Sequence, residues 1–146
     1  GKKDFENIDR IASLIYQRIP QINRCLILLS HKEIVKLNPL KATITKERLE
    51  FLREIDSITT SILIEEKWYE KVWQCPTVFL PLSVNNQGEE FVVIRPVYSE
   101  RGMTAQPSFL DEITRNKLNE KISKFEKISA VALDISTKPP GTIEWE

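Results

Sequence analysis

Apolar residues with helical spacing alternate along this chain with short runs of strand-forming residues, and this alternation restricts the fold most. A first apolar stripe predicts an amphipathic helix over residues 4–19, and a second predicts a helix from Thr45, a typical N-cap, to about residue 66. Ser108 and Asp111 are candidate caps of a third helix. The apolar stripe of that third helix comprises Leu110, Ile113, Leu118, Ile122 and Phe125.

The segments between these helices predict strands at residues 22–29, 77–84, 90–98 and 128–135. The second and third of these runs flank Asn85-Asn86-Gln87-Gly88, which is typical of a hairpin turn. Pro81 and Pro96 interrupt the same two runs and should lie at edges or bulges, because proline has no backbone N–H to donate. We therefore predict an α+β fold in the order α-β-α-β-β-α-β, with helices packed on one face of a sheet.

Composition argues against several classes of protein. The 146 residues include 21 Lys and Arg and 21 Asp and Glu, so the formal net charge is zero and no nucleic-acid partner is expected. No apolar run approaches the roughly 20 residues that a membrane span needs, so no membrane partner is expected either. Nothing resembles a secretion signal, so we expect a cytoplasmic chain in which Cys25 and Cys75 are free, partly buried thiols.

No familiar catalytic or metal-binding constellation is present in the sequence. The single histidine, His31, has no nucleophile near it in sequence and is interpreted as a loop residue. The acidic pairs Glu65–Glu66 and Glu89–Glu90 are adjacent in sequence, so their side chains should diverge into solvent. We therefore assign no catalytic residue and no metal ligand.

Three features are less ordinary. In the C-terminal tail, residues 136–146, Lys138 precedes two prolines and Trp145 lies between glutamates. Either this tryptophan packs on the domain, or the tail folds over a ligand and Lys138 supplies positive charge to an anion. Arg95 lies in an apolar strand, where arginine is usually an edge residue or an ion-pair member, although it could instead reach a partner subunit. Gln74 precedes a strand and could contact a base or a sugar, or close a turn by a hydrogen bond.

The tail, Asp134 to Glu146 (DISTKPPGTIEWE), resembles the C-terminal end of GMP synthases, the glutamine-hydrolysing enzymes of guanine nucleotide synthesis. Residues 52–56 (LREID), 71–74 (KVWQ) and 95–105 (RPVYSERGMTA) extend this resemblance over most of residues 45–146. The preceding residues, with Ile22-Asn23-Arg24, resemble the end of an extra copy found in eukaryotic-type members. We therefore predict a closing αβ piece of a preceding subdomain copy at 1–41 and a dimerisation-type domain at 42–146.

The resemblance implies a role within a larger enzyme. GMP synthases combine a glutaminase domain, an ATP pyrophosphatase domain and this C-terminal domain. ATP with magnesium activates xanthosine monophosphate (XMP), and ammonia from glutamine then gives GMP. The C-terminal domain helps to bind XMP and forms the dimer contact in bacterial members, whereas an extra copy can replace the partner subunit. The isolated chain is expected to hold no cofactor and to be inactive, because it lacks the phosphate loop and the glutaminase residues.

The resemblance also implies site residues. Lys138 matches the family lysine at the phosphate end of the nucleotide, Glu144 and the backbone near Ile143 match tail positions that contact XMP, and Gln74 matches a glutamine beside the same ligand. Arg95 remains an interface candidate. Arg101 stands where members of the family commonly have an aspartate. Because the charge is reversed, no ion pair of the family is assigned to this position. Without ligand, we expect the tail to be disordered.

Two other classes of function compete with this interpretation. One is a non-catalytic α+β module for oligomerisation or for regulation by a small ligand, which composition alone leaves open. The other is an RNA-binding domain of comparable topology, against which the zero net charge and the lack of a Gly-x-x-Gly loop both count.

Overall fold

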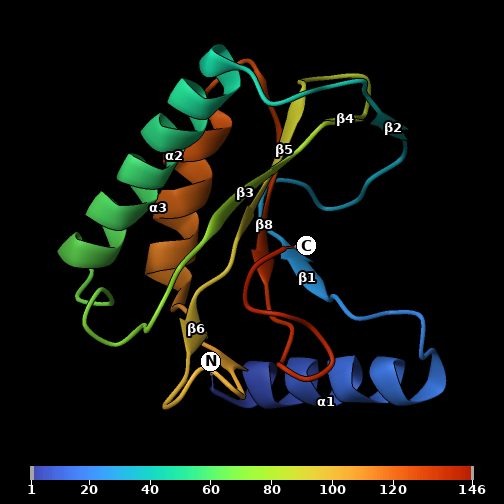
Figure 1. Cartoon of the computed structure of the whole chain (residues 1–146), viewed down its shortest axis with the longest axis vertical. Helices are drawn as coiled ribbons and strands as arrows, with labels where there is room; N and C mark the ends of the chain where they lie inside the picture. Colours follow the sequence, from blue (N-terminus) through green and yellow to red (C-terminus); the bar gives the residue numbers. More distant parts are fainter. Residues whose placement is uncertain (1, 146) are drawn as a thin grey trace.

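The computed structural model describes residues 2–145 and is built around a four-stranded sheet in the order β1-β8-β5-β3 (Figure 1). Strand β8 (Ile128–Asp134) pairs in parallel with β5 (Glu90–Ile94) at the centre of the sheet. The outer strands β1 (Leu26–Leu28) and β3 (Thr77–Leu80) pair antiparallel with β8 and β5. Both central strands are buried along their whole length, and their residues are apolar except for Glu90, Ser129 and Asp134.

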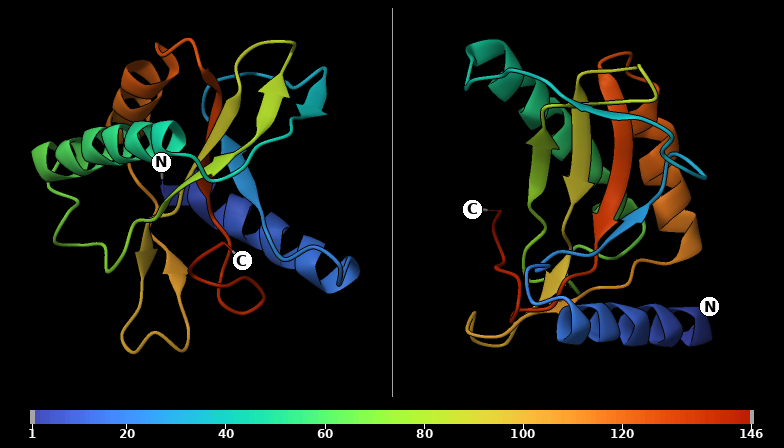
Figure 2. Two further views of the ribbon diagram at one scale, coloured as in Figure 1. Left: turned by 45° about the horizontal axis from the view of Figure 1, so that its top comes forward. Right: turned by 90° about the vertical axis from the view of Figure 1, so that its right-hand side faces the viewer.

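Two helices cover one face of this sheet side by side, α2 (Lys46–Glu65) and α3 (Glu112–Ser123) (Figures 1 and 2). Their inward side chains and those of the sheet form a single apolar core, whose fully buried members include Ile55, Leu118, Ile122, Val131 and Leu133. Helix α1 (Lys2–Arg18) lies across one end of the sheet (Figure 2, right) and contributes Ala12 to the same core. The predicted α+β class is therefore confirmed.

The start of each core helix is fixed by a capping side chain. Thr45 accepts a hydrogen bond from the Arg48 N–H at 3.1 Å, as predicted for α2. Asp111 accepts one from the Thr114 N–H at 2.9 Å, so Asp111 and not Ser108 is the N-cap of α3. The predicted stripe of α3 is wrong at Ile113, which is 62% exposed. The buried face is instead formed by side chains four residues apart, namely Thr114, Leu118 and Ile122.

The hairpin is confirmed, but two prolines divide its strands. Thr77 pairs with Ile94 and Leu80 with Phe91, and the chain turns between them through a glycine. That Gly88 has φ +70°, and a Cβ there would lie 2.5 Å from the Ser129 backbone, so only glycine fits.

The chain changes partners where the prolines interrupt the predicted strands. After Pro81, β4 (Leu82–Val84) pairs with an unpredicted strand, β2 (Leu37–Pro39). After Pro96, β6 (Val97–Tyr98) pairs with β7 (Gln106–Pro107). Pro81 and Pro96, predicted at edges or bulges, thus lie at breaks between strands, where no ladder N–H is needed from them.

The segment of residues 1–41 joins the same sheet as the rest of the chain. Its strand β1 is shorter than the predicted 22–29 and pairs with β8, so that Leu26 faces Asp134 in the register. The division into a preceding copy and a second domain stays a prediction. Within residues 2–145, no helix has both the length and the apolar character to cross a membrane. Cys25 and Cys75 are free and partly buried, as expected.

Candidate functional site: a tail pocket over a buried ion cluster

The C-terminal tail leaves β8 and folds back over the end of the sheet. Lys138 and Ala105 exchange two backbone hydrogen bonds of 2.9 and 3.2 Å, which join the tail to the segment before β7. The Gly141 N–H then donates to the Thr137 carbonyl at 2.9 Å and closes the proline-containing turn. The expectation of a disordered tail is therefore wrong, because contacts within the domain itself hold it.

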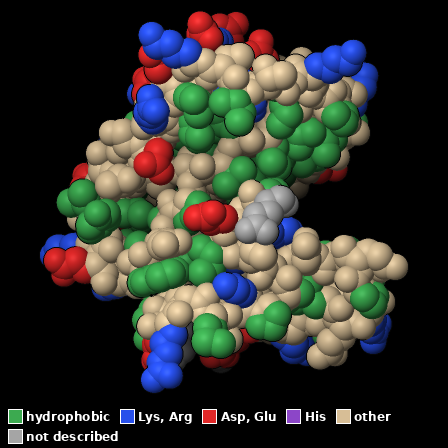
Figure 3. Space-filling model, in the orientation of Figure 1, with side chains coloured by type: hydrophobic (Ala, Val, Ile, Leu, Met, Phe, Trp, Pro, Cys, Tyr) green, Lys and Arg blue, Asp and Glu red, His purple; other side chains and the backbone are tan. Residues whose placement is uncertain are grey.

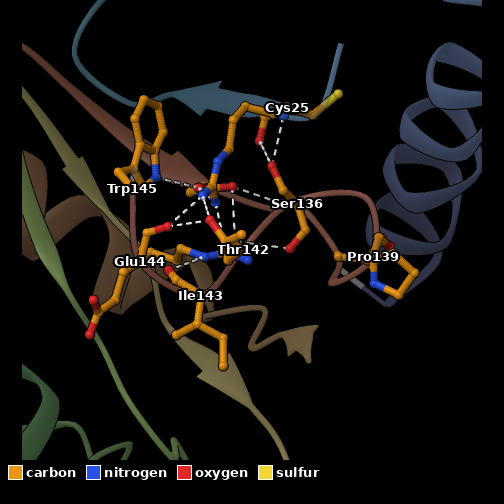
Figure 4. Close-up of polar contacts among 11 residues, drawn as sticks. Cys25, Ser136, Pro139, Thr142, Ile143, Glu144 and Trp145 are labelled. Carbon is orange, nitrogen blue, oxygen red and sulfur yellow. Dashed lines mark hydrogen bonds and ion pairs between the residues drawn. The ribbon is translucent and has the colours of Figure 1, made fainter. Parts of the chain in front are cut away.

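The last residue of β8, Asp134, has a fully buried carboxylate that contacts the tail residues Ser136 and Trp145, both labelled in Figure 4. It accepts hydrogen bonds from the Trp145 indole N–H at 2.8 Å and from the Ser136 backbone N–H at 2.8 Å. Arg24 and Arg95 each approach it to 3.1 Å. Four donors around one carboxylate offset the cost of removing it from water. Trp145 thus packs on the domain, which is the first of the two alternatives for the tail.

Arg95 is the inner partner of this carboxylate and has no exposed area. Its Nε donates to the Ile143 carbonyl at 2.8 Å and its Nη1 to the Ser136 carbonyl at 2.9 Å. Burial lowers the pKa of the Arg95 guanidinium, and the Asp134 charge opposes that shift. The ion-pair alternative for Arg95 is confirmed, whereas its assignment as an interface candidate is corrected, because a buried side chain cannot contact another subunit.

Arg24 is the outer partner and has no role in the sequence analysis. It donates to the Thr142 carbonyl at 2.8 Å, to the Thr142 hydroxyl at 2.7 Å and to the Glu144 carbonyl at 2.8 Å. Its guanidinium also lies 4.9 Å from the Trp145 ring centroid. A contact between residues 118 positions apart leaves no local sequence signal, which is why the sequence analysis missed it.

A pocket of about 280 Å³ opens beside this cluster and brings together the four residues predicted to bind a ligand. Its lining consists of Trp73, Gln74, Lys138, Thr142, Ile143 and Glu144. The backbone of Gln74 pairs with Val97, which leaves its exposed side chain available. The Glu144 carboxylate points away from the ion cluster (Figure 4).

Lys138 is held at the pocket by its ammonium group, which donates to the Gly102 carbonyl at 2.7 Å. An ammonium has three N–H donors, so this contact orients the group and leaves two donors for a ligand. The pocket therefore offers a cation, an amide and a carboxylate to a polar ligand, whereas the Thr142 hydroxyl is already used by Arg24 and the Glu144 carbonyl.

Three titratable side chains outside the pocket, those of Cys75, His31 and Glu90, are buried or contact neighbouring protein groups. Burial raises the pKa of the Cys75 thiol to about 12, which makes it a poor nucleophile. The ring of His31 lies 2.7 Å from the Ser30 hydroxyl. Glu90 is buried and paired with Arg48 at 2.6 Å, so the prediction of a solvated carboxylate is wrong there. Within residues 2–145, no three His, Cys, Asp or Glu side chains are grouped as a metal site.

The fold and the pocket together define a small α+β domain whose own tail lines a polar pocket. Residues 61–145 match the family described as the GMP synthase C terminal domain, and the chain belongs to that family. On the face drawn in Figure 3, Lys and Arg side chains are scattered among acidic ones, without a continuous basic patch.

Relatives of the chain are bacterial GMP synthases of the glutamine-hydrolyzing type. A probable GMP synthase of Leptospira interrogans is 32% identical over 146 residues, which cover 98% of this chain and 24% of the relative. The enzyme of Streptomyces avermitilis is 34% identical over 160 residues, covering 98% of this chain and 30% of the relative. The chain thus spans between about a quarter and a third of the length of these relatives, and the similarity includes residues 1–41.

Proposed function

We propose that this domain helps to bind XMP within a GMP synthase, where it contributes the tail pocket to a site completed by other domains. The observation that carries the proposal is the meeting of Gln74, Lys138, Ile143 and Glu144 around one pocket. Gln74 and Lys138 line the same pocket although they are 64 positions apart in sequence. All four residues are ones that the family resemblance assigns to the nucleotide.

The charges around the pocket suit a nucleotide monophosphate. Arg24 and Arg95 with Asp134 form a group of net charge +1 under the tail. The pocket lining adds the positive charge of Lys138 and the negative charge of Glu144, so the region keeps a net charge of +1. In the proposed complex the Lys138 ammonium binds the phosphate by a charge-assisted hydrogen bond. The Glu144 carboxylate accepts hydrogen bonds from sugar hydroxyls, the Ile143 backbone contacts the nucleotide, and the Gln74 amide lies beside it.

The proposal places the chemistry itself outside this chain. ATP and magnesium would act in the ATP pyrophosphatase domain of the parent enzyme, and ammonia would come from its glutaminase domain. The parent enzyme would work in the cytoplasm, and this domain alone would be inactive. What this domain supplies is binding and orientation of XMP, since the pocket lining holds no nucleophile paired with a base.

Association with another domain or with a second copy is a further part of this proposal. Support comes from a group of exposed apolar side chains between β1 and the start of α2, formed by Ile34, Val35, Leu37, Leu40, Ile44 and Leu49. Ile44 is 84% and Val35 79% exposed. In Figure 3 hydrophobic side chains gather on the upper part of the molecule. Exposed apolar groups of this kind favour a protein interface.

The full-length parent enzyme tests the role of the pocket. Lys138→Ala removes one charge-assisted hydrogen bond, worth about 1.5–3 kcal/mol, so the KM for XMP should rise by about 10-fold to 150-fold. Glutaminase activity should change little. The matched control is Lys41→Ala, which removes an exposed lysine outside the pocket lining. An unchanged KM for XMP in the Lys138 variant would contradict the proposal.

A further inference from the structure

Three consecutive carbonyls of the tail are each bound by an arginine. Arg24 donates to the carbonyls of Thr142 and Glu144, and Arg95 donates to the carbonyl of Ile143 between them. Among the described residues, 142–145 make no hydrogen bond from backbone to backbone. Guanidinium groups therefore take the place that a neighbouring strand would have in fixing this segment.

The N–H groups of the Arg24 guanidinium are almost all used by the protein itself. Nη1 donates to Asp134 and to the Thr142 carbonyl, and Nη2 donates to the Thr142 hydroxyl and to the Glu144 carbonyl. A guanidinium has five N–H groups, so only Nε–H is left without one of these partners. Three of the four hydrogen bonds of Arg24 thus go to the tail and one to Asp134 of β8, and 15% of its side chain is exposed.

We propose that Arg24 is a positioning residue for the tail pocket, which it holds open for the nucleotide from the opposite end of the sequence. With Asp134 and Arg95 it fixes Thr142, Ile143 and Glu144, three of the six residues that line the pocket. The link to nucleotide binding rests on the proposed function, whereas the fastening of the tail does not.

The residues that form and hold the tail pocket thus extend beyond the part of the chain that matches the family. The match begins at residue 61, whereas Arg24 follows α1 and precedes β1 in the segment of residues 1–41. The antiparallel pairing of β1 with β8 sets Leu26 opposite Asp134, and this register brings Arg24 to the start of the tail. A domain cut to the matched residues would keep Lys138 and Glu144 but lose the residue that holds their segment in place.

The full-length parent enzyme with Arg24→Gln separates fastening from ligand contact. The first measurement is cleavage after Glu144 by a glutamate-specific protease without nucleotide, followed by mass spectrometry. Release of the tail should make this cleavage at least about 10-fold faster, because one charged partner of several tail groups is lost. The second measurement is the KM for XMP, which should rise by about 10-fold or more, while kcat at saturating XMP and glutaminase activity change less than about twofold.

Two further variants complete the design. Arg18→Gln removes an exposed arginine of the same segment and should leave both measurements unchanged. Arg24→Lys keeps a positive charge beside Asp134 but not the planar fork, so both measurements should change less than in Arg24→Gln. This variant also serves if Arg24→Gln fails to fold, which the midpoint of thermal unfolding reports.

The cleavage rate and the KM for XMP test different parts of the proposed role of Arg24. A raised KM with unchanged cleavage in both Arg24 variants would mean that Arg24 contacts the ligand directly, and this would overturn the positioning role. Faster cleavage with an unchanged KM would show that the pocket does not need a fastened tail, which overturns the inference as well. If Lys138→Ala leaves the KM for XMP unchanged, the proposed function fails, while the cleavage rates still decide whether Arg24 fastens the tail.

Discussion

The body and the tail of this molecule are held by different forces. The body, defined here as the four-stranded sheet with α2 and α3, is held by apolar burial, and residues such as Ile55, Leu118 and Leu133 have no exposed area. Among the described residues of the tail, Ile143 is the only buried apolar side chain. The tail is held mainly by the ion cluster of Arg24, Arg95 and Asp134 and by backbone hydrogen bonds to Ala105.

This difference determines how each region responds to change. Apolar burial has no preferred direction, so the body should accept apolar replacements that conserve volume. Hydrogen bonds from guanidinium groups depend on a fixed planar geometry, so even replacements that conserve charge or size should loosen the tail from the domain. Because the tail adds few apolar contacts, it should open locally at a lower free energy than the body.

The largest expected effect comes from removing the inner arginine. Arg95→Met leaves the fully buried Asp134 with Arg24 as its only charged partner, and a broken buried ion pair typically costs about 3–5 kcal/mol. Urea denaturation followed by circular dichroism measures this loss. In the double variant Arg95→Met/Asp134→Leu no carboxylate is left buried without Arg95, so part of the stability should return. The return is incomplete because Arg24, the Ser136 N–H and the Trp145 N–H lose their acceptor, and the tail stays open to protease.

That double variant is the strongest test of whether the tail and the body are held by different forces. If it restores protease resistance of the tail together with stability, then apolar packing can hold the tail as well as the ion cluster does. The orphaned Arg95 Nη2, which has no hydrogen-bond partner in the described part of the chain, already shows that the cluster is not fully satisfied.

A cavity in the body gives the next largest effect. Leu118→Ala removes a fully buried side chain between α3 and the sheet and should lower the free energy of unfolding by about 2–5 kcal/mol. Ile113→Ala lies on the same helix, but its side chain is 62% exposed, so its effect should stay within about 0.5 kcal/mol. Similar losses in the two variants would contradict the orientation of α3.

The body could largely be predicted from the sequence because its signals are local. Helical spacing gave α2 to within about a residue, and Thr45 and Asp111 act as caps within one turn of the backbone that they bind. Ile113 was misassigned because an apolar residue next to the stripe cannot be distinguished from a member of it by spacing alone. The burial of Glu90 was missed because its partner, Arg48, is 42 residues away.

The tail site was predictable only in part. A resemblance to a known family pointed to Lys138, Glu144, Ile143 and Gln74, whereas spacing gave no reason to group them. Arg24 lies 110 residues from Asp134, and their contact depends on the pairing of β1 with β8. Strand pairing of this kind depends on the whole fold, so no local sequence pattern indicates which arginine holds the tail.

A smaller loss than in Arg95→Met or Leu118→Ala is expected at Asp111, an exposed carboxylate of the body that contrasts with the buried Asp134. Asp111→Ala removes the N-cap of α3 and should lower the free energy of unfolding by about 1 kcal/mol. The hydrogen bond from Thr114 lowers the pKa of Asp111 below its ordinary value of 3.8 in the folded state. The charge therefore stabilises the fold fully above that ordinary value, and the benefit is lost as the pH falls through the lower folded pKa.

Asp111→Asn isolates this charge, because asparagine also caps helices but does not titrate. The wild type should be slightly more stable than this variant at neutral pH, and the difference should shrink as urea denaturation is repeated at pH values falling through and below 3.8. A difference that grows with acidity would have the wrong sign for a lowered pKa. A difference at neutral pH as large as the loss in Arg95→Met would remove the distinction between a solvated cap and a buried ion cluster.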